Sequence, residues 1–348
     1  MLSRYTRLGA SSRLRFFQYL PYLEKMGFSF TIRPFFEDNY LAGIYKGKVP
    51  LFSVLKSYVN RLITMLGSQR LDAIWLEAEL FRWLPAWVEE GLFPSGVPLV
   101  VDYDDAIFHW YEAQRFPGLS RLLGKKINRI MSIADLVVVG NDYLGEYARS
   151  AGARRVEKVL TVVDIDRYIV PARDDSRRLT VGWIGTPVTA KFLFPIAEAL
   201  LEIVKRFGVR IVAVGANSQQ FRGFPVEVRP WRENTEVAEI QKFDIGVMPL
   251  PDEPYERGKC GYKLIQYMAC GKPVVASPVG VNAEIVRHSE NGFLATTTEE
   301  WINALSRLIA DSELRSCMGQ EGRSLVESEY SLQVQAPRLE RMLRSVIF

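Results

Sequence analysis

Long apolar runs, histidines and paired cysteines are scarce in this sequence. No stretch approaches the ~18 consecutive apolar residues of a membrane-spanning helix. The only histidines, His109 and His288, argue against a histidine-built metal site, and the three cysteines have neither zinc nor redox spacing. An odd cysteine count, together with a start that lacks the apolar core of a signal peptide, predicts a reducing compartment. We therefore expect a cytoplasmic protein.

The composition is that of a globular protein with about two domains. Its 348 residues are 48% hydrophobic and 24% charged, which is enough for two separate cores. The net charge is only +4, but residues 1–70 hold eleven Lys or Arg against three Asp or Glu, a net charge of +8. This asymmetry indicates an anionic partner such as phospholipid or a lipid-diphosphate acceptor, with a solvated basic face as the alternative. The basic residues lack the aromatic interleaving of nucleic-acid modules, which argues against nucleic acid.

Residues 51–66 have the pattern of an amphipathic helix. Apolar side chains recur at helical spacing, and Lys56 and Arg61 occupy the opposite face. Such a helix can lie on an anionic membrane surface, or it can cover a sheet. Lys46 and Lys48, just before the helix, favour the membrane. We therefore expect a peripheral contact with the inner face of a membrane.

Strand and helix patterns alternate along the chain. The strands are expected at 1–5, 28–33, 71–77, 98–103, 135–139 and 159–163, and then at 180–184, 209–214, 226–228, 243–248, 274–277 and 292–295. This alternation predicts an α/β protein with two Rossmann-like, doubly wound parallel sheets. Residues 171–178 are polar and contain a proline, which predicts a linker. The expected parts are an N-terminal domain 1–170, a linker 171–178, a C-terminal domain 179–330 and a final helix 331–348.

The segment 256–280 combines a loop of small and basic residues, a helix expected at 262–270, and a buried strand. A glycine loop that leads into a helix presents unpaired backbone N–H groups and the positive end of the helix dipole. Lys259 and Lys263 add positive charge there. The segment is therefore either an anion site or an ordinary loop–helix–strand unit.

Three carboxylates, Asp102, Asp104 and Asp105, end the strand expected at 98–103. Open α/β sheets bind their ligands at this end of the strands. The carboxylates could act as a base, orient a sugar hydroxyl, hold a metal ion or cap the next helix. Their mutual repulsion should raise one pKa, which favours a functional role.

Several motifs of the second half resemble those of glycosyltransferase family 4. The segment 267–276, YMACGKPVVA, is similar to the family's EAMACGxPVVA, and residues 278–294 resemble its GGxPEIV and NGFLV motifs. Gly185 and Lys191 match the Gly and Lys of its GRLxxxKG donor loop. The resemblance covers residues 134–332 well and residues 1–130 less well. It implies a GT-B fold, in which two Rossmann-like domains face a central cleft and the C-terminal helix crosses back to the N-terminal domain.

The resemblance also implies roles for particular residues. The diphosphate of a nucleotide sugar would be stabilised by Lys191, by the backbone at Gly261 and by the helix that starts at Tyr262. Trp231 would line the nucleobase pocket, and Glu284 would bind the donor sugar or a nearby loop. The donor-binding candidates are Gly185, Thr186, Lys191, Trp231, Lys259, Gly261, Tyr262, Lys263, Gln266 and Glu284. The catalytic candidates are Asp102, Asp104 and Asp105.

The sequence departs from the family at four positions. Gly258 and Gln266 stand where the family has the two carboxylates of a Glu-x7-Glu motif, and Gln266 can still hydrogen-bond a ribose. Thr186 replaces an arginine, and Asp104 replaces a histidine. Lys259 and Lys263 are additional charges that can replace the missing arginine.

We therefore expect a glycosyltransferase that moves a sugar from a UDP-, GDP- or dTDP-sugar to a glycan or lipid-linked acceptor. The family implies retention of anomeric configuration, no required cofactor and no metal, and a role in bacterial-type surface polysaccharide or glycolipid synthesis. A non-catalytic protein that binds nucleotide sugars or glycans, and a nucleotide-sugar epimerase of the same fold, are the alternatives. The donor, the acceptor and the linkage are not predicted.

Overall fold

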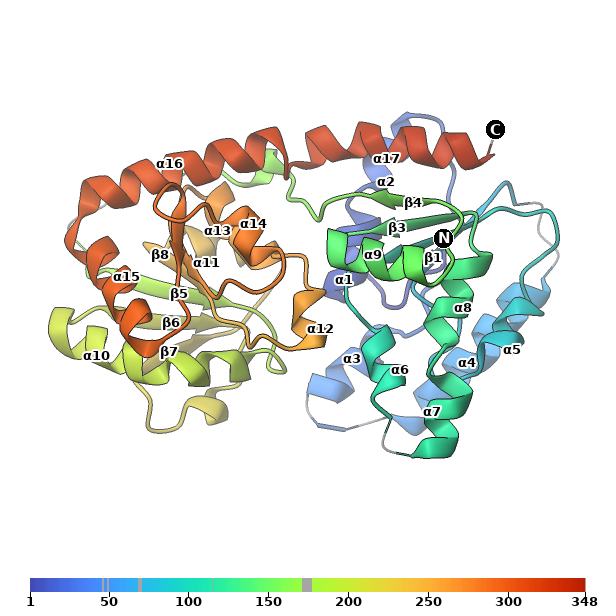
Figure 1. The fold of residues 1–348 in the computed structure, drawn as a ribbon, viewed down its shortest axis with the longest axis horizontal. Helices are drawn as coiled ribbons and strands as arrows, with labels where there is room; N and C mark the ends of the chain where they lie inside the picture. The colour runs from blue at the N-terminus through green and yellow to red at the C-terminus, as the bar shows by residue number, and fades with distance from the viewer. Residues whose placement is uncertain (46, 49, 68–70, 115, 171–176, 348) are drawn as a thin grey trace. The chain divides into compact units, whose positions relative to one another are not determined.

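The computed structural model describes residues 1–45, 47–48, 50–67, 71–114, 116–170 and 177–347. The chain divides into two compact units. The first comprises Met1–Thr161, Arg257–Cys260 and Gln335–Phe348, and the second comprises Val162–Glu256 and Gly261–Val334. Each unit contains one parallel sheet (Figure 1), so the expected fold class is confirmed. Most of the linker expected at 171–178 lies outside the described residues.

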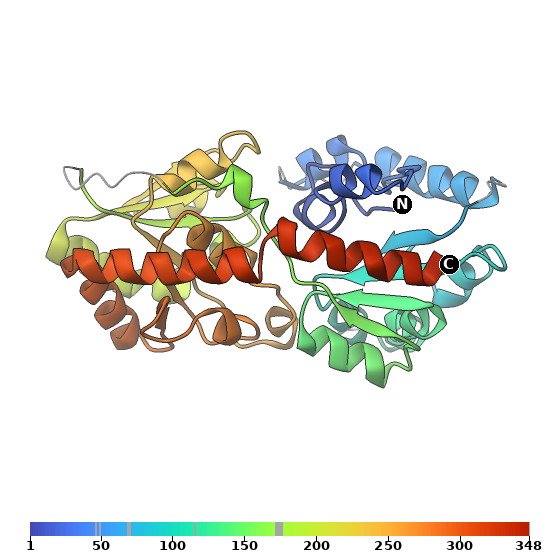
Figure 2. The same ribbon diagram turned by 90° about the horizontal axis from the view of Figure 1, so that it is seen from above.

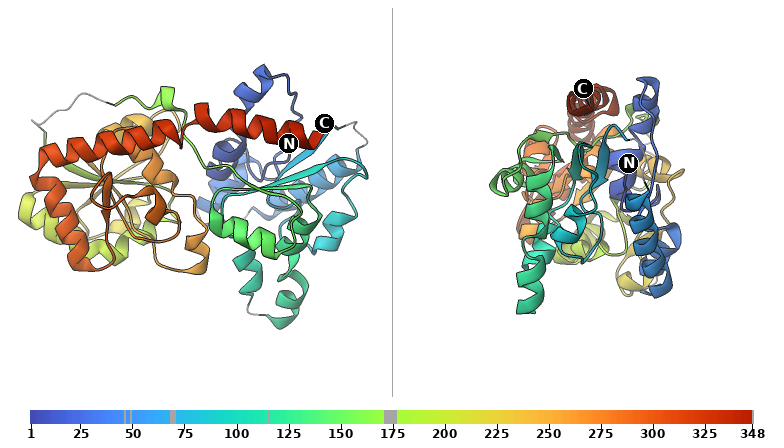
Figure 3. Two further views of the ribbon diagram at one scale, coloured as in Figure 1. Left: turned by 45° about the horizontal axis from the view of Figure 1, so that its top comes forward. Right: turned by 90° about the vertical axis from the view of Figure 1, so that its right-hand side faces the viewer.

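The first unit has a four-stranded sheet in the order β1-β2-β3-β4, with every neighbouring pair parallel. The strands are β1 (Ile74–Glu77), β2 (Leu99–Tyr103), β3 (Leu136–Val139) and β4 (Val156–Lys158). The helices are α1 (Ala10–Ser12), a π-helical turn (Arg13–Phe17), α2 (Leu20–Lys25), α3 (Asp38–Tyr45), α4 (Leu51–Leu66), α5 (Ala86–Glu90), α6 (Phe108–Glu112), α7 (Pro117–Leu123), α8 (Lys126–Ile133) and α9 (Asp142–Ser150). Figures 2 and 3 show the early helices, in blue, on one face of this sheet and α8 and α9, in green, on the other.

Three expected strands of the first unit are wrong. Residues 1–5 form only isolated bridges, Leu2 with Leu76 and Tyr5 with Phe36, and residues 28–33 form no strand. In place of the strand expected at 159–163, the structure has β4 at Val156–Lys158, which ends just before the expected range begins. The Val159 N–H still donates to the Val139 carbonyl at 3.0 Å, but the chain then leaves the sheet, and the Val163 N–H donates instead to the Tyr330 carbonyl at 3.1 Å, within the second unit.

The second unit has a six-stranded parallel sheet in the order β10-β9-β8-β5-β6-β7. Its strands are β5 (Thr180–Ile184), β6 (Arg210–Val214), β7 (Val226–Arg229), β8 (Ile245–Met248), β9 (Val274–Ala276) and β10 (Gly292–Leu294). Its α-helices are α10 (Ala197–Phe207), α11 (Glu236–Gln241), α12 (Pro254–Arg257), α13 (Tyr262–Ala269), α14 (Asn282–Ile285), α15 (Thr298–Ala310) and α16 (Ser312–Ser328), where the last residue of α12 is grouped with the first unit. Short 3-10 helices cover Ile165–Arg167, Ala190–Ile196 and Ser218–Phe221. The final helix, α17 (Leu332–Ile347), belongs to the first unit from Gln335 onward.

Alternating side chains of the second sheet build its core. Val181, Trp183 and Ile211 are buried on one face with residues of α10 and α15. On α13, the buried Tyr267 accepts a hydrogen bond from the Ile184 N–H at 3.0 Å. This contact ties α13 to the end of β5.

A buried ion pair connects three segments of the first unit. Arg15, in the π-helical turn, donates from Nε to Asp102 Oδ1 at 2.7 Å and from a terminal nitrogen to Asp102 Oδ2 at 3.2 Å. Its other terminal nitrogen donates to the Val159 carbonyl at 2.6 Å. Both side chains are 2% exposed, and burial raises the pKa of Asp102 although Arg15 opposes that change. A pair this deep is costly to break, because the remaining partner keeps its charge without compensation.

We expect Arg15→Met to lower the free energy of unfolding by about 3–5 kcal/mol, because it leaves Asp102 buried without its partner. Lys56→Met is the matched control, since Lys56 and Glu37 form an exposed pair at 3.3 Å. Pairs of that kind contribute about 0–1 kcal/mol. Urea denaturation of the two variants and the native protein measures both effects. Equal losses in the two variants would contradict this account of Arg15.

Candidate functional site

In the second unit, the loops at the carboxyl ends of β5, β6 and β7 bring several predicted residues together. Gly185 follows β5 and Trp231 follows β7. Gly215, after β6, has φ +84°, and a Cβ there would lie 2.2 Å from the Gly185 carbonyl and 3.1 Å from Trp231 Cβ. Only glycine allows these loops to approach so closely. Thr186 is fixed beside them, because its N–H donates to Thr189 Oγ1 at 3.1 Å.

Helix α13 begins without a capping side chain. Its N-cap, Gly261, is left-handed, with φ +65°, and makes no side-chain cap hydrogen bond. A Cβ on Gly261 would lie 2.3 Å from Ile285 Cδ1, so the glycine also allows the loop before α14 to pack here. Lys263, in the first turn, lies with Nζ 5.6 Å from the centre of the Trp183 ring. The positive end of the helix dipole and a lysine in the first turn make this end suited to an anion.

A buried polar cluster lies behind these loops. Glu236, which is 4% exposed, accepts hydrogen bonds from Trp231 Nε1 at 2.8 Å and from the Tyr168 hydroxyl at 3.3 Å. Gln266, which is 2% exposed, donates from Nε2 to the Tyr168 oxygen at 2.9 Å, and the Tyr262 hydroxyl lies 3.5 Å from the same oxygen. The cluster links Trp231 to the first turns of α13. Sequence reasoning did not assign Glu236 and Tyr168 to the site, because only the fold places them beside Trp231 and Gln266.

The remaining donor candidates are more peripheral. Lys191 is exposed in the 3-10 helix Ala190–Ile196, and its Nζ lies 5.3 Å from the centre of the Phe192 ring. Glu284 is exposed on α14. Both residues follow carboxyl ends of strands of the same sheet, so they lie on the edge that carries Gly185 and Trp231.

The three aspartates of the first unit have different surroundings. Asp102 is held in the ion pair with Arg15. Asp104 and Asp105 follow β2 and are half-buried. Burial, together with the neighbouring carboxylates of Asp105 and Glu77, raises the pKa of Asp104 to about 7. A carboxyl group with this pKa can exchange a proton near neutral pH.

The segment Arg257–Cys260 is bound to the first unit beside these acids. Lys259 Nζ lies 3.5 Å from Asp105 Oδ1, and Cys260 Sγ donates to the Asp104 carbonyl at 3.1 Å. Asn141 Nδ2 donates to the Gly258 carbonyl at 2.8 Å. Lys259 thus pairs with a predicted catalytic acid, whereas Lys263 belongs to the second unit.

The absence of a side chain at Gly258 has a packing reason. A Cβ on Gly258 would lie 2.5 Å from Ala106 Cβ and 2.9 Å from the Ala106 nitrogen. The backbone at Gly258 therefore rests directly on the chain that follows β2. A glutamate, which the resemblance places at this position, has no room unless the loop moves.

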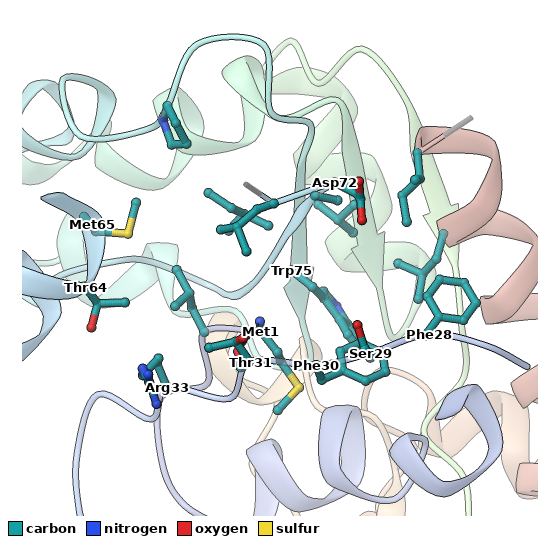
Figure 4. Close-up of a pocket in the computed structure, with 18 of the residues that line it drawn as sticks. Met1, Phe28, Ser29, Phe30, Thr31, Arg33, Thr64, Met65, Asp72 and Trp75 are labelled. Atoms are coloured by element: carbon teal, nitrogen blue, oxygen red, sulfur yellow. Dashed lines mark hydrogen bonds between the residues drawn. The ribbon is translucent and has the colours of Figure 1, made fainter. Parts of the chain in front are cut away.

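A cavity of about 390 Å³ lies elsewhere, near the amino ends of β1 and β2 (Figure 4). Phe28, Phe30, Trp75 and Met65 line it together with Arg33. The predicted donor residues and aspartates are not among its lining residues. Within the described part of the chain, no group of three or more His, Cys, Asp or Glu side chains could hold a metal ion.

The structure has known relatives in fold. A glycosyltransferase from Rickettsia africae superposes with a TM-score of 0.70 at 12% identity, covering 99% of this chain and 97% of that chain. Anabaena Alr3699/HepE, solved in complex with UDP and glucose, superposes with a TM-score of 0.67 at 18% identity, covering 94% and 89%. This likeness identifies the fold as GT-B, which is a fold of glycosyltransferases.

The sequence narrows this class. Residues 178–311, most of which lie in the second unit, match the family described as "Glycosyl transferases group 1". A curated relative, the D-inositol 3-phosphate glycosyltransferase of Actinosynnema mirum, is 24% identical over 232 residues. The match covers 57% of this chain and 54% of that protein, so the chain spans about half the length of the curated relative.

We expect Gly258→Ala to lower the free energy of unfolding by about 1–3 kcal/mol, because the new methyl group overlaps Ala106. Gly118→Ala is the control, since a Cβ at Gly118 meets nothing within 4 Å. Thermal and urea denaturation compare the two variants. If Gly258→Ala were as stable as the native protein, the loop would have to be free to move away from Ala106.

The raised pKa of Asp104 predicts a pH-dependent stability. Its usual value is 3.8 and its folded value is about 7, so the folded protein holds the extra proton between these pH values. Stability should therefore fall as pH rises from about 4 to about 7, by up to about 1.4 kcal/mol per pH unit from this group. Asp104→Asn should remove the part of this dependence that comes from Asp104. Compared with the native protein, the variant should therefore be more stable at pH 8 than at pH 5. If the free energies of unfolding of the two proteins changed with pH in parallel, the raised pKa of Asp104 would be disproved.

Proposed function

We propose that this chain is a glycosyltransferase that transfers a sugar from a nucleotide-diphosphate sugar to a glycan or lipid-linked acceptor. The observation that carries the proposal is the start of α13, where Gly261 is left-handed and Lys263 lies in the first turn, inside the segment that matches group 1 glycosyltransferases. The solved Anabaena relative with UDP and glucose supports a UDP-sugar as the first donor to test.

The proposed chemistry uses the second unit for the leaving group. When the glycosidic bond to the diphosphate breaks, negative charge grows on the diphosphate oxygens. The N–H groups at the start of α13, with Lys263 and Lys191, stabilise that charge in the transition state. Trp231 offers an aromatic surface to the base, and Glu236 fixes its indole through the 2.8 Å hydrogen bond.

The first unit supplies the acid–base group. Asp104, with its pKa near 7, accepts a hydrogen bond or a proton from the acceptor hydroxyl, and the Asp105–Lys259 pair sets the local charge. Asp102 holds the strand end through Arg15 and does not react. Retention of configuration, independence of metal and a role in surface polysaccharide or glycolipid synthesis form part of this proposal.

A binding protein without catalysis is the second candidate. It is favoured by Gly258, whose packing on Ala106 leaves no room for the first carboxylate of the Glu-x7-Glu motif. Incubation with UDP-, GDP- and dTDP-sugars separates the two functions. Release of the nucleoside diphosphate supports the enzyme, whereas a thermal shift without release supports the binding protein. No thermal shift with any of the donors would contradict both.

We expect Lys263→Ala to weaken binding of the nucleotide sugar by about tenfold, since a charge-assisted contact to phosphate contributes about 1.5–3 kcal/mol. Lys191→Ala should act in the same direction. Lys205→Ala, in the last turn of α10, is the control and should bind the donor normally. Isothermal titration calorimetry with the donor that gives the largest thermal shift measures the three variants. Unchanged affinity in Lys263→Ala would contradict the proposed diphosphate cradle.

A further inference from the structure

Helix α4 turns its apolar face away from the protein. Seven large apolar side chains of this 16-residue helix are between 42% and 82% exposed. They are Leu51, Phe52, Leu55, Val59, Leu62, Ile63 and Leu66. A helix on a globular protein normally packs such a stripe against the core and leaves its polar side to water. A contiguous exposed apolar surface of this kind marks an interaction site.

Polar contacts hold α4 in this orientation. Ser53, Ser57 and Arg61, on the opposite side of the helix, are buried. A terminal nitrogen of Arg61 donates to the Ser3 carbonyl at 2.8 Å, and its guanidinium lies 5.4 Å from the centre of the Phe35 ring. Ser53 Oγ donates to Asn39 Oδ1 at 3.1 Å. Rotating the helix to bury the leucines would break these contacts and expose the partners they satisfy.

The charge around α4 is positive. Residues 39–71 contain five Lys or Arg and no Asp or Glu. Two of the five, Lys48 and Lys56, are exposed, and Lys56 shares an exposed ion pair with Glu37. An apolar surface flanked by lysines suits a partner that is apolar in its interior and anionic at its surface.

Among the described residues, no helix has both the length and the apolar character needed to cross a bilayer. The Tyr58 hydroxyl donates to the Arg82 carbonyl, so the segment before Trp83 lies beside α4, and Trp83 is itself 40% exposed. Tryptophan is enriched where proteins meet the polar–apolar boundary of a membrane.

We propose that α4 is a membrane-docking helix that lies in the plane of an anionic phospholipid bilayer with its seven apolar side chains in the lipid. The polar side, which a free interfacial helix would show to water, is bound by the protein itself. The proposal concerns the first unit and does not depend on the identity of the donor. It deepens the proposed function, because it would bring an acceptor that is anchored in lipid to the enzyme.

The test is sedimentation of the full-length chain with vesicles, without any nucleotide sugar. Phosphatidylcholine vesicles with phosphatidylglycerol should bind the protein more strongly than pure phosphatidylcholine. Phe52→Gln/Ile63→Gln should reduce binding to anionic vesicles by about tenfold or more. Leu201→Gln/Phe207→Gln is the matched control, since both residues are exposed on α10, and it should bind within about twofold of the native protein.

Lys48→Gln/Lys56→Gln tests the electrostatic part and should reduce binding severalfold only on anionic vesicles, with loss of its salt dependence. Circular dichroism checks that every variant is folded. A Phe52→Trp variant gives an independent readout, because brominated lipid should quench its added fluorescence. The donor assays above are run in solution, so a failure of vesicle binding and a failure of the proposed transfer would be distinguishable.

Three results would overturn the proposal. One is a native protein that binds neither kind of vesicle. Another is equal binding by the Phe52/Ile63 variant and the Leu201/Phe207 control. The third is a native dimer in the absence of lipid that becomes monomeric only in the Phe52/Ile63 variant, which would identify the face as a self-association surface.

Discussion

The buried ion pair of Arg15 with Asp102 organises the first unit. It joins the π-helical turn to the end of β2, and the same guanidinium holds the carbonyl of Val159, just after β4. Because Asp104 follows Asp102 by two residues, the pair also fixes the position of the acid with the raised pKa. The cluster expected from three neighbouring carboxylates thus separates into a structural acid and two acids near the surface. Charge repulsion was visible in the sequence, but the arginine that neutralises Asp102 is 87 residues away.

The segment 256–280 combines two kinds of anchoring. Residues Arg257–Cys260 are bound to the first unit through Asn141, Asp104 and Asp105. Gly261 then begins α13 in the second unit. The two lysines that looked like one patch of charge therefore have separate surroundings. Lys259 balances Asp105, and Lys263 remains the cation of the α13 start, so the positive charge proposed for the donor is smaller than the sequence suggested.

The basic character of residues 1–70 also divides on folding. Arg13, Arg15 and Arg61 are buried, where they serve packing and hydrogen bonding rather than an anionic partner. The amphipathic pattern of residues 51–66 predicted the helix with its bounds, yet periodicity could not tell which face is inward. The structure buries the serines and the arginine and exposes the leucines, because Ser3, Asn39 and Phe35 supply partners for the polar side. The surface that residues 51–66 expose is consequently as apolar as it is basic.

The sequence by itself determined the fold class, most strands of both sheets and the loop that leads into α13. Alternation of buried strands with helices and the glycines around α13 are local signals, and local signals survive in a linear chain. Tertiary structure decided what depends on distant partners. It left residues 28–33 outside a sheet, ended β4 at Lys158 and placed Ala106 where a side chain at position 258 would have to go. It also brought Glu236 and Tyr168 to Trp231 and Gln266, since hydrogen bonds between residues far apart in the chain exist only after the sheets have formed.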